Sequence, residues 1–159
     1  MYSNQMVLAI GSLMLLSFII LGFYNSNATH ISNSSNNDAV IIGSSIGMSI
    51  IEEISLKKFD HNVAAGTITP VSGLSTTMGA ETGESIIYQF NDIDDYNNYI
   101  KINYDSNLGA FSITIKVSYV DMSNPNVPIS SKRYHKRIAA KVENEYLSSP
   151  LNLYHIISY

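Results

Sequence analysis

The chain of 159 residues contains no cysteine and no tryptophan. The absence of cysteine excludes a disulfide framework, a thiolate zinc site and a cysteine nucleophile. Basic residues are also few, because nine Lys and Arg stand against thirteen Asp and Glu and leave a net charge of −4. We therefore predict no nucleic-acid partner, since only residues 132–137 bring basic side chains together. We interpret residues 132–137 as a solvated face of a strand, with contact to an acidic neighbour as the alternative.

The first part of the chain lacks charge altogether. No Asp, Glu, Lys or Arg precedes Asp38, and residues 5–24 are almost all apolar. A run of about 18 or more uncharged apolar residues is long enough to cross a bilayer as a helix. A cleaved secretory signal is the alternative, but its apolar region is shorter and follows a basic segment. We predict that residues 1–24 form a retained transmembrane helix of a single-pass membrane protein with an extracytoplasmic domain.

The next segment changes character twice. Residues 25–37 are rich in Asn and Ser, which lower helix propensity and favour a loop or a weak, partly melted helix. From Asp38 to about Phe59, apolar residues recur at steps of three and four, which predicts an amphipathic helix. Within it, Gly43 and Gly47 form a small-xxx-small pattern that lets two helices approach closely, or that only weakens a surface helix. Residues 25–59 are thus predicted to be a polar stretch and an amphipathic helical stalk.

The remainder has the signals of a sheet. Residues 60–86 carry several Gly, Thr and Ser residues without periodicity, which predicts a long surface connection. The period-2 alternation over residues 111–119 predicts a strand with one buried face, and residues 121–128 read as a hairpin connection rich in turn residues. The predicted strands are 86–90, 100–104, 111–119, 134–143 and 151–159. We therefore predict an α+β chain in which residues 60–159 form a small antiparallel β-sheet domain.

One cluster could carry chemistry. Asp92, Asp94 and Asp95 are the densest set of oxygen ligands, and such sets suit a hard cation such as calcium. The alternative is a turn in which Asp side chains bond backbone amides. The four histidines are scattered singly, and nucleophile elbows and phosphate loops are absent from the sequence. We predict no enzymatic activity, no small-molecule substrate and no cofactor other than calcium at this cluster.

Two phrases carry a resemblance to a known family. Residues 49–60 (SIIEEISLKKFD) and 90–98 (FNDIDDYNN) resemble segments of type IV pilin-like proteins, in particular minor pilins of the mannose-sensitive haemagglutinin pilus type. In those proteins a helix ends in a phrase similar to LIEEI…KxFD, and FDDVDDY follows later. The strands over residues 115–121 and 134–142 also look like the family's late hairpin. The resemblance covers roughly residues 39–145, together with the plan of a hydrophobic N-terminal helix.

The resemblance implies a structural subunit of a bacterial type IV pilus-like or pseudopilus-like filament at the cell surface or in the periplasm. In the family, the hydrophobic half of the helix lies in the inner membrane before assembly. It then packs among the helices of identical or related pilin-like subunits. Family members usually carry Glu at the fifth position of the mature chain, where Gln5 stands here. A Gln can hydrogen-bond a neighbour's N-terminal amine but cannot neutralise it.

The two hypotheses for function differ in what the long helix touches. For a filament subunit, the expected assembly residues are Gln5, Leu8, Leu15, Phe18, Ile20, Gly43 and Gly47. These side chains should contact other copies of the chain. The alternative is a membrane-anchored extracytoplasmic binding module that does not polymerise, in which the apolar helix contacts only lipid.

Overall fold

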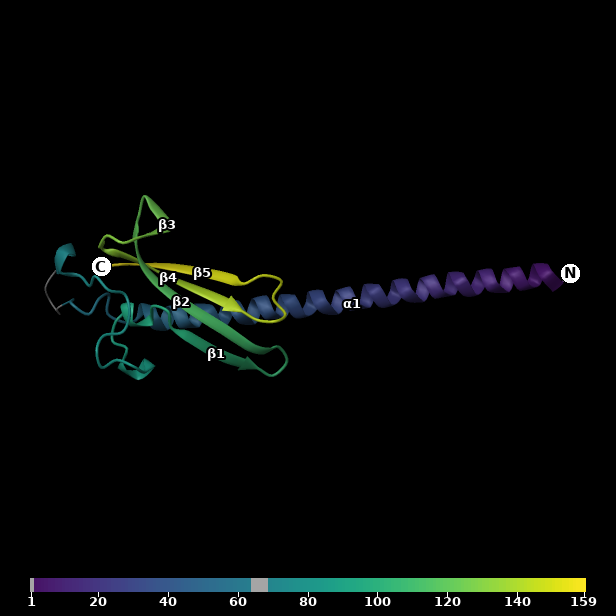
Figure 1. Cartoon of the computed structure of the whole chain (residues 1–159), viewed down its shortest axis with the longest axis horizontal. Helices are drawn as coiled ribbons and strands as arrows, with labels where there is room; N and C mark the ends of the chain where they lie inside the picture. The colour runs from purple at the N-terminus through teal and green to yellow at the C-terminus, as the bar shows by residue number, and fades with distance from the viewer. Residues whose placement is uncertain (1, 64–68) are drawn as a thin grey trace. The chain divides into compact units, whose positions relative to one another are not determined.

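The computed structural model describes residues 2–63 and 69–159, as one long helix followed by an antiparallel sheet (Figure 1). Helix α1 spans Tyr2–Ser55. The strands are β1 (Ile100–Asp105), β2 (Gly109–Asp121), β3 (Asn124–Ile129), β4 (His135–Glu143) and β5 (Leu151–Ser158). The predicted α+β class is confirmed.

Helix α1 continues through the Asn- and Ser-rich residues 25–37, so of the two alternatives given for this segment the helix agrees with the structure and the loop does not. The helix ends at Ser55, short of the predicted end at Phe59. The chain divides into two compact units, and the division falls after Asp38, where the predicted amphipathic segment begins. The first unit contains only helix, whereas the second contains the last turns of α1 and all of the sheet.

The sheet is built around β2, which pairs antiparallel with β1, β3 and β4, while β5 pairs with β4. Four of the five predicted strands are present. The prediction of a strand over residues 86–90 is wrong, because Ile87–Gln89 is a short 3₁₀ helix. The Gln89 side chain accepts hydrogen bonds from the amides of Ser85 and Ile86, which occupies groups that a strand would pair. The predicted hairpin connection instead contains β3, whose prolines are tolerated because it pairs on one side only.

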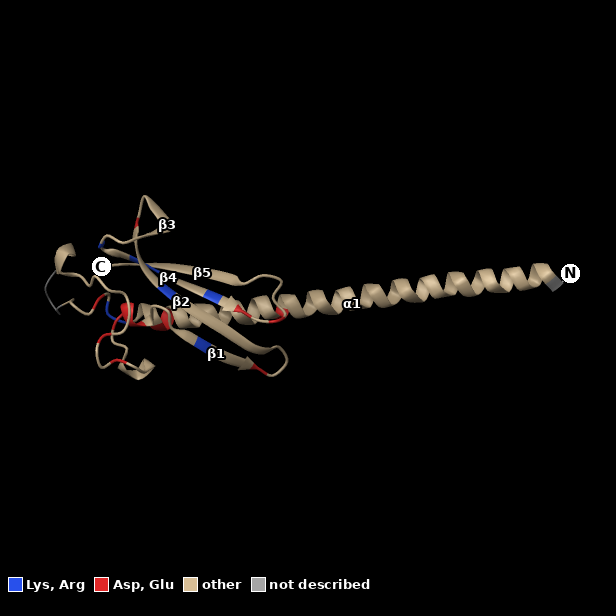
Figure 2. Cartoon of the chain, in the orientation of Figure 1, with Lys and Arg blue, Asp and Glu red and all other residues tan. Residues whose placement is uncertain are grey.

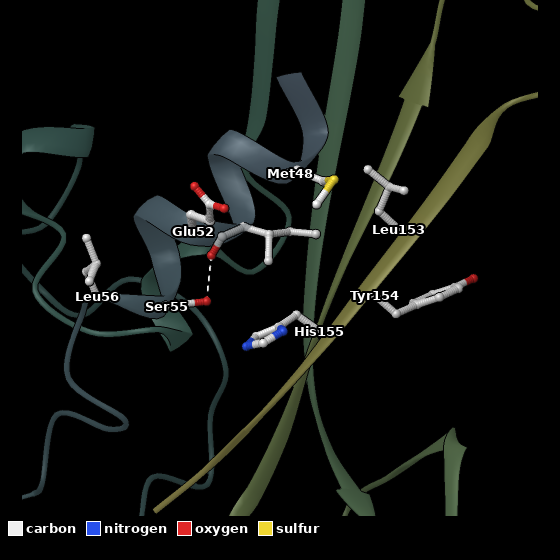
Figure 3. Close-up of a pocket in the computed structure, with 8 residues that line it drawn as sticks. Met48, Glu52, Ser55, Leu56, Leu153, Tyr154 and His155 are labelled. Carbon is white, nitrogen blue, oxygen red and sulfur yellow. Dashed lines mark hydrogen bonds between the residues drawn. The ribbon is translucent and has the colours of Figure 1, made fainter. Parts of the chain in front are cut away.

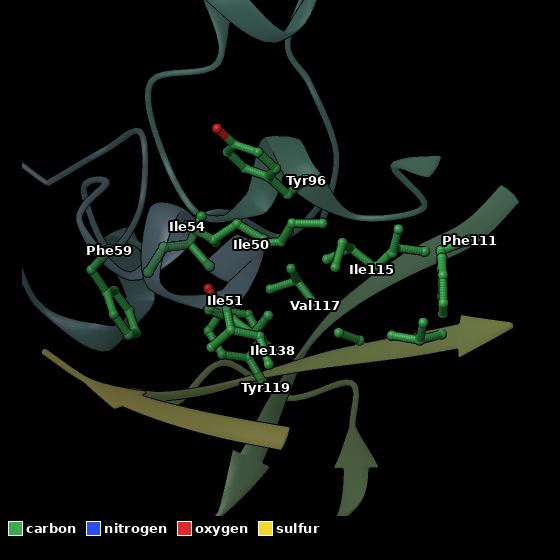
Figure 4. Packing of buried hydrophobic residues seen from close by; sticks show 14 of the residues in the cluster. Ile50, Ile51, Ile54, Phe59, Tyr96, Phe111, Ile115, Val117, Tyr119 and Ile138 are labelled. Carbon is green, nitrogen blue, oxygen red and sulfur yellow. The ribbon is translucent and has the colours of Figure 1, made fainter. Parts of the chain in front are cut away.

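The part of α1 that belongs to the second unit, residues 39–55, covers one face of the sheet (Figure 4). Ile50 and Ile54 from the helix are buried, as predicted from their spacing. They belong to one hydrophobic cluster with the inward residues of β2, namely Phe111, Ile113, Ile115, Val117 and Tyr119. The predicted alternation of β2 is therefore confirmed, and Ile138, Ala140 and Val142 form the buried face of β4.

The connection between helix and sheet is packed rather than simply exposed. Leu74 is buried in the hydrophobic cluster, and Asp60 is fully buried. Ser75 ties the middle of the connection to its beginning, because its amide donates to both carboxylate oxygens of Asp60 at 3.0 and 3.1 Å. The connection therefore packs against the sheet, where the Tyr119 hydroxyl of β2 donates to the Ser75 carbonyl, and it brings Asp92 beside Lys58, just after α1.

Candidate functional site

Lys136 on β4 lies at the centre of a buried ionic network. Its ammonium donates to Asp94 Oδ2 at 2.7 Å, to Asp60 Oδ2 at 2.9 Å and to the Phe59 carbonyl at 2.7 Å. The three charged side chains are fully buried. The rings of Phe59 and Tyr119 lie 4.5 and 5.2 Å from the ammonium, close enough for cation–π attraction. One cation therefore joins the end of the helix, the connection and the sheet.

The pKa values of the two carboxylates that contact Lys136, Asp60 and Asp94, shift in opposite directions. Burial raises the pKa of Asp60, but hydrogen bonds from Lys136 and Ser75 outweigh burial and leave that pKa below its usual value. For Asp94 the same attraction to Lys136 is weaker than burial, which raises the pKa to about 7. Asp60 is therefore the carboxylate whose charge Lys136 mainly balances, and Asp94 titrates near neutrality.

This network corrects the interpretation of residues 132–137 as a solvated face. Lys136 points inward, and the alternative of contact with an acidic neighbour holds for it, through Asp60 and Asp94. A signal was present in the sequence, because Lys136 has the same parity along β4 as Ile138 and the other buried residues. The partners could not be found that way, since Asp60 lies 76 positions away from Lys136.

The acidic residues before β1 form a turn, as one of the two alternatives predicted. Asp92 Oδ1 accepts the amide hydrogens of Asp94 and Asp95 at 2.7 and 3.3 Å. Asp95 Oδ2 accepts those of Asn91 and Asp92 at 2.7 and 3.0 Å. These bonds order the 3₁₀ helix Asp94–Tyr96. The turn leaves the second oxygen of each of these two aspartates, Asp92 Oδ2 and Asp95 Oδ1, without a hydrogen-bond donor among the described residues.

The structure does not bring Asp94 together with Asp92 and Asp95 as the predicted calcium ligands. Asp94 turns to Lys136 instead. The residue that joins the other two is Glu81, from the connection: Glu81, Asp92 and Asp95 each offer a carboxylate oxygen, and these oxygens lie within 4.8 Å of one another. Sequence reasoning missed Glu81 because it lies 11 and 14 positions before its two partners and follows no recognised ligand spacing.

The first unit presents a different kind of site. The apolar side chains of α1 from Met6 to Tyr24 are exposed to between 46% and 73%, and the helix is long and apolar enough to cross a membrane. Among them are four predicted assembly residues, Leu8, Leu15, Phe18 and Ile20. Gln5 is exposed as well. The N-terminal part of α1 carries no charged side chain (Figure 2). This surface therefore needs lipid or another apolar surface to cover it.

Gly43 and Gly47 do not belong to that surface. A Cβ on Gly43 would lie 3.1 Å from Leu151 Cδ1, and a Cβ on Gly47 would lie 2.5 Å from Leu153 Cδ1. The glycines thus permit close packing, as the small-xxx-small pattern indicates, but their partner is β5 of the same chain. Their assignment to an assembly face between copies is wrong.

A shallow groove of about 580 Å³ lies between the end of α1 and β5 (Figure 3). Its apolar wall includes Met48, Leu56 and Leu153, and its polar groups include Glu52 and His155. The hydroxyl of Ser55 donates to the Ile51 carbonyl at 2.6 Å, so its hydrogen is held within the helix. The groove offers apolar contact rather than an arranged set of reactive groups.

In comparisons with protein-family models, with curated proteins and with solved structures, this chain matches none of them.

Proposed function

We propose that this chain is a structural subunit of a type IV pilus-like or pseudopilus-like filament, which assembles through the first unit of α1. The observation that carries the proposal is the exposed, uncharged surface of residues 3–34 in that unit. The proposal agrees with the resemblance of residues 49–60 and 90–98 to type IV pilin-like proteins. In such a subunit, lipid covers the helix before assembly and neighbouring helices cover it afterwards.

The length of α1 favours neighbouring helices over lipid alone. A bilayer crossing needs about 20 residues, whereas the part of α1 that belongs to the first unit spans residues 2–38. Residues 25–34 lie beyond the apolar run, are exposed, and consist largely of weak helix formers such as Asn, Ser and Thr. Most helices in proteins are stabilised by packing against neighbours rather than by intrinsic propensity. A bundle of like helices would provide such neighbours along the full length of this segment.

The lack of charge also suits a helix bundle. Burying an unpaired charge in an apolar bundle is costly, and residues 1–37 contain no charged side chain. Asn and Ser side chains can hydrogen-bond across helices where two helices approach closely. The polar part of the first unit can therefore be buried among copies of itself without stranded charges.

Disulfide trapping tests the proposal, because the chain has no native cysteine to interfere. Leu15→Cys and Asn27→Cys would each be introduced into the full chain in its native cells. Mild oxidation of sheared surface or periplasmic filament material should yield disulfide-linked dimers, since each variant carries a single thiol. Ala39→Cys is the matched control on the same helix, since this residue is fully buried against its own sheet and should not cross-link.

Two outcomes would oppose the proposal. If the chain stays in the membrane fraction and neither cysteine forms dimers, the helix contacts lipid alone and the chain is a tethered binding module. If Ala39→Cys cross-links as readily as Leu15→Cys, the contacts are collisions of unfolded or aggregated protein.

A further inference from the structure

The cluster of Glu81, Asp92 and Asp95 is built from two segments that the fold holds together. The backbone of Lys58, just after α1, pairs with Asn91 and Ile93, so the aspartate turn is fixed beside the end of the helix. On the other side, the Asn97 side chain donates to the Met78 carbonyl at 3.2 Å and accepts from the Val117 amide at 3.1 Å. The approach of Glu81 to the two aspartates is therefore part of the packed structure.

The cluster contains oxygens that lack a donor. Asp92 is fully buried and Asp95 is 3% exposed. Asp92 Oδ2, Asp95 Oδ1 and Glu81 Oε2 are all buried, and none of them has a hydrogen-bond partner among the described residues. The opposite oxygens of both aspartates are already bound to backbone amides. Buried carboxylate oxygens are normally satisfied, so three in one cluster call for a positive group.

Side chains in the described structure supply little positive charge to this cluster. Lys136 is held by Asp60 and Asp94. His61 Nδ1 lies 3.8 Å from Glu81 Oε2, but its side chain is half exposed. Three carboxylates whose oxygens lie within 4.8 Å of one another repel each other unless a cation joins them.

We propose that Glu81, Asp92 and Asp95 bind a calcium ion. The donors are all carboxylate oxygens, which select hard cations over softer metals. Calcium accepts six to eight oxygens in flexible geometry, so water and Glu84, whose carboxylate lies beside Glu81, can complete the shell. Magnesium requires a stricter octahedron at shorter distances. The ion would tie the connection to the aspartate turn and so to the end of α1, whether or not the chain assembles into filaments.

The test is a calcium titration of the full chain in detergent after removal of metal with a chelator. Isothermal calorimetry should show saturable binding of one calcium ion, with a dissociation constant of about 10⁻⁴ to 10⁻³ M, as in extracellular modules. The midpoint of thermal unfolding should rise with calcium and saturate over the same range. An equal ionic strength of sodium chloride should not reproduce that rise.

Variants locate the site. Glu81→Gln keeps the size of the side chain and leaves the backbone bonds of both aspartates in place, so it should fold and weaken calcium binding at least tenfold. Glu52→Gln is the matched control, because Glu52 is exposed on α1 outside the cluster. Asp92→Asn should also weaken binding, and near-ultraviolet circular dichroism shows whether that variant remains folded.

Three results would overturn the proposal. The first is absence of saturable binding by the unaltered chain up to several millimolar calcium. The second is Glu81→Gln binding calcium as tightly as Glu52→Gln. The third is tight zinc binding that calcium cannot displace, which would assign the site to the neighbouring group of His61, Glu81 and Glu84.

Discussion

Replacement of Lys136 by Met tests whether the buried network holds the second unit together. Met has a similar length and no charge, so Lys136→Met removes the ammonium with little change in volume. Asp60 and Asp94 then remain fully buried without their cation. Removing one partner of a buried ion pair typically destabilises a protein by about 3–5 kcal/mol.

The structure sets the size of the effect and its dependence on pH. Without Lys136, burial raises the pKa of Asp60, so the folded variant must bind a proton that the unfolded chain, with a pKa of 3.8, releases. At about 1.4 kcal/mol per pH unit, that proton costs about 4 kcal/mol at pH 7 and about 2 kcal/mol at pH 5. Asp94 adds little to this loss of stability at pH 7, because burial raises its pKa to about 7 even in the chain that keeps Lys136. When the pKa of a group is higher in the folded state than in the unfolded state, the folded protein becomes less stable as pH rises. The stability lost in Lys136→Met should therefore be smaller at pH 5 than at pH 7.

The assay is thermal unfolding of the full chain in mild detergent at pH 7 and pH 5. Near-ultraviolet circular dichroism of the eleven tyrosines reports tertiary packing, and the chain has no tryptophan to dominate the signal. Lys136→Met should lower the midpoint by roughly 12–20 °C at pH 7 and by about half as much at pH 5. Lys141→Met is the control, because the pair of Lys141 with Glu143 is nearly half exposed and should matter by at most about 1 kcal/mol. Equal loss at both pH values, or no greater loss than Lys141→Met, would refute the reasoning.

Three further predictions concern packing and solubility. Gly47→Leu should lower the unfolding free energy by about 1–3 kcal/mol, because a side chain there meets β5, whereas Gly22→Leu has open space and should leave the tertiary transition unchanged. Deletion of residues 1–38 should leave the second unit folded and soluble without detergent, which gel filtration and circular dichroism can check; a chain that still aggregates would contradict the assignment of the apolar surface to the first unit. Tyr119→Phe should cost about 1–2 kcal/mol in denaturant unfolding, because its hydroxyl lies 2.9 Å from the Ser75 carbonyl and 3.2 Å from Asp60 Oδ2. Tyr104→Phe, at an 80% exposed position, should have no effect.

Much of the fold follows from local patterns. Alternation over residues 111–119 identifies β2 and its buried face, because successive side chains of a strand point to opposite faces. The spacing of Ile42, Ile46 and Ile50 identifies the covering face of α1. The failures are also local: at residues 86–90 the apolar pattern suggested a strand, but the Gln89 side chain binds the backbone amides and favours a 3₁₀ turn.

The polar part of α1, residues 25–37, is helical although its residues have low intrinsic helix propensity. Residues 25–37 favour a loop by composition, yet they are helical in the structure. Propensity differences are a fraction of a kcal/mol per residue, and a helix that is already nucleated on both sides extends more easily than a new one starts. The composition of residues 25–37 therefore indicates that the surface of the helix is polar there, but it does not indicate the backbone conformation.

The order of residues is enough to establish that the first 37 residues are uncharged, that an apolar run long enough to span a bilayer comes first, and that an antiparallel sheet follows. These properties depend on neighbours in the chain. The folded structure was needed to establish that Gly43 and Gly47 pack on the chain's own sheet, that Lys136 is buried between Asp60 and Asp94, and that Glu81 rather than Asp94 joins Asp92 and Asp95. Those contacts join residues that are far apart in the chain. A local pattern such as hydrophobic periodicity can indicate which face of an element is buried, but it cannot indicate which distant side chain will lie beside a buried charge.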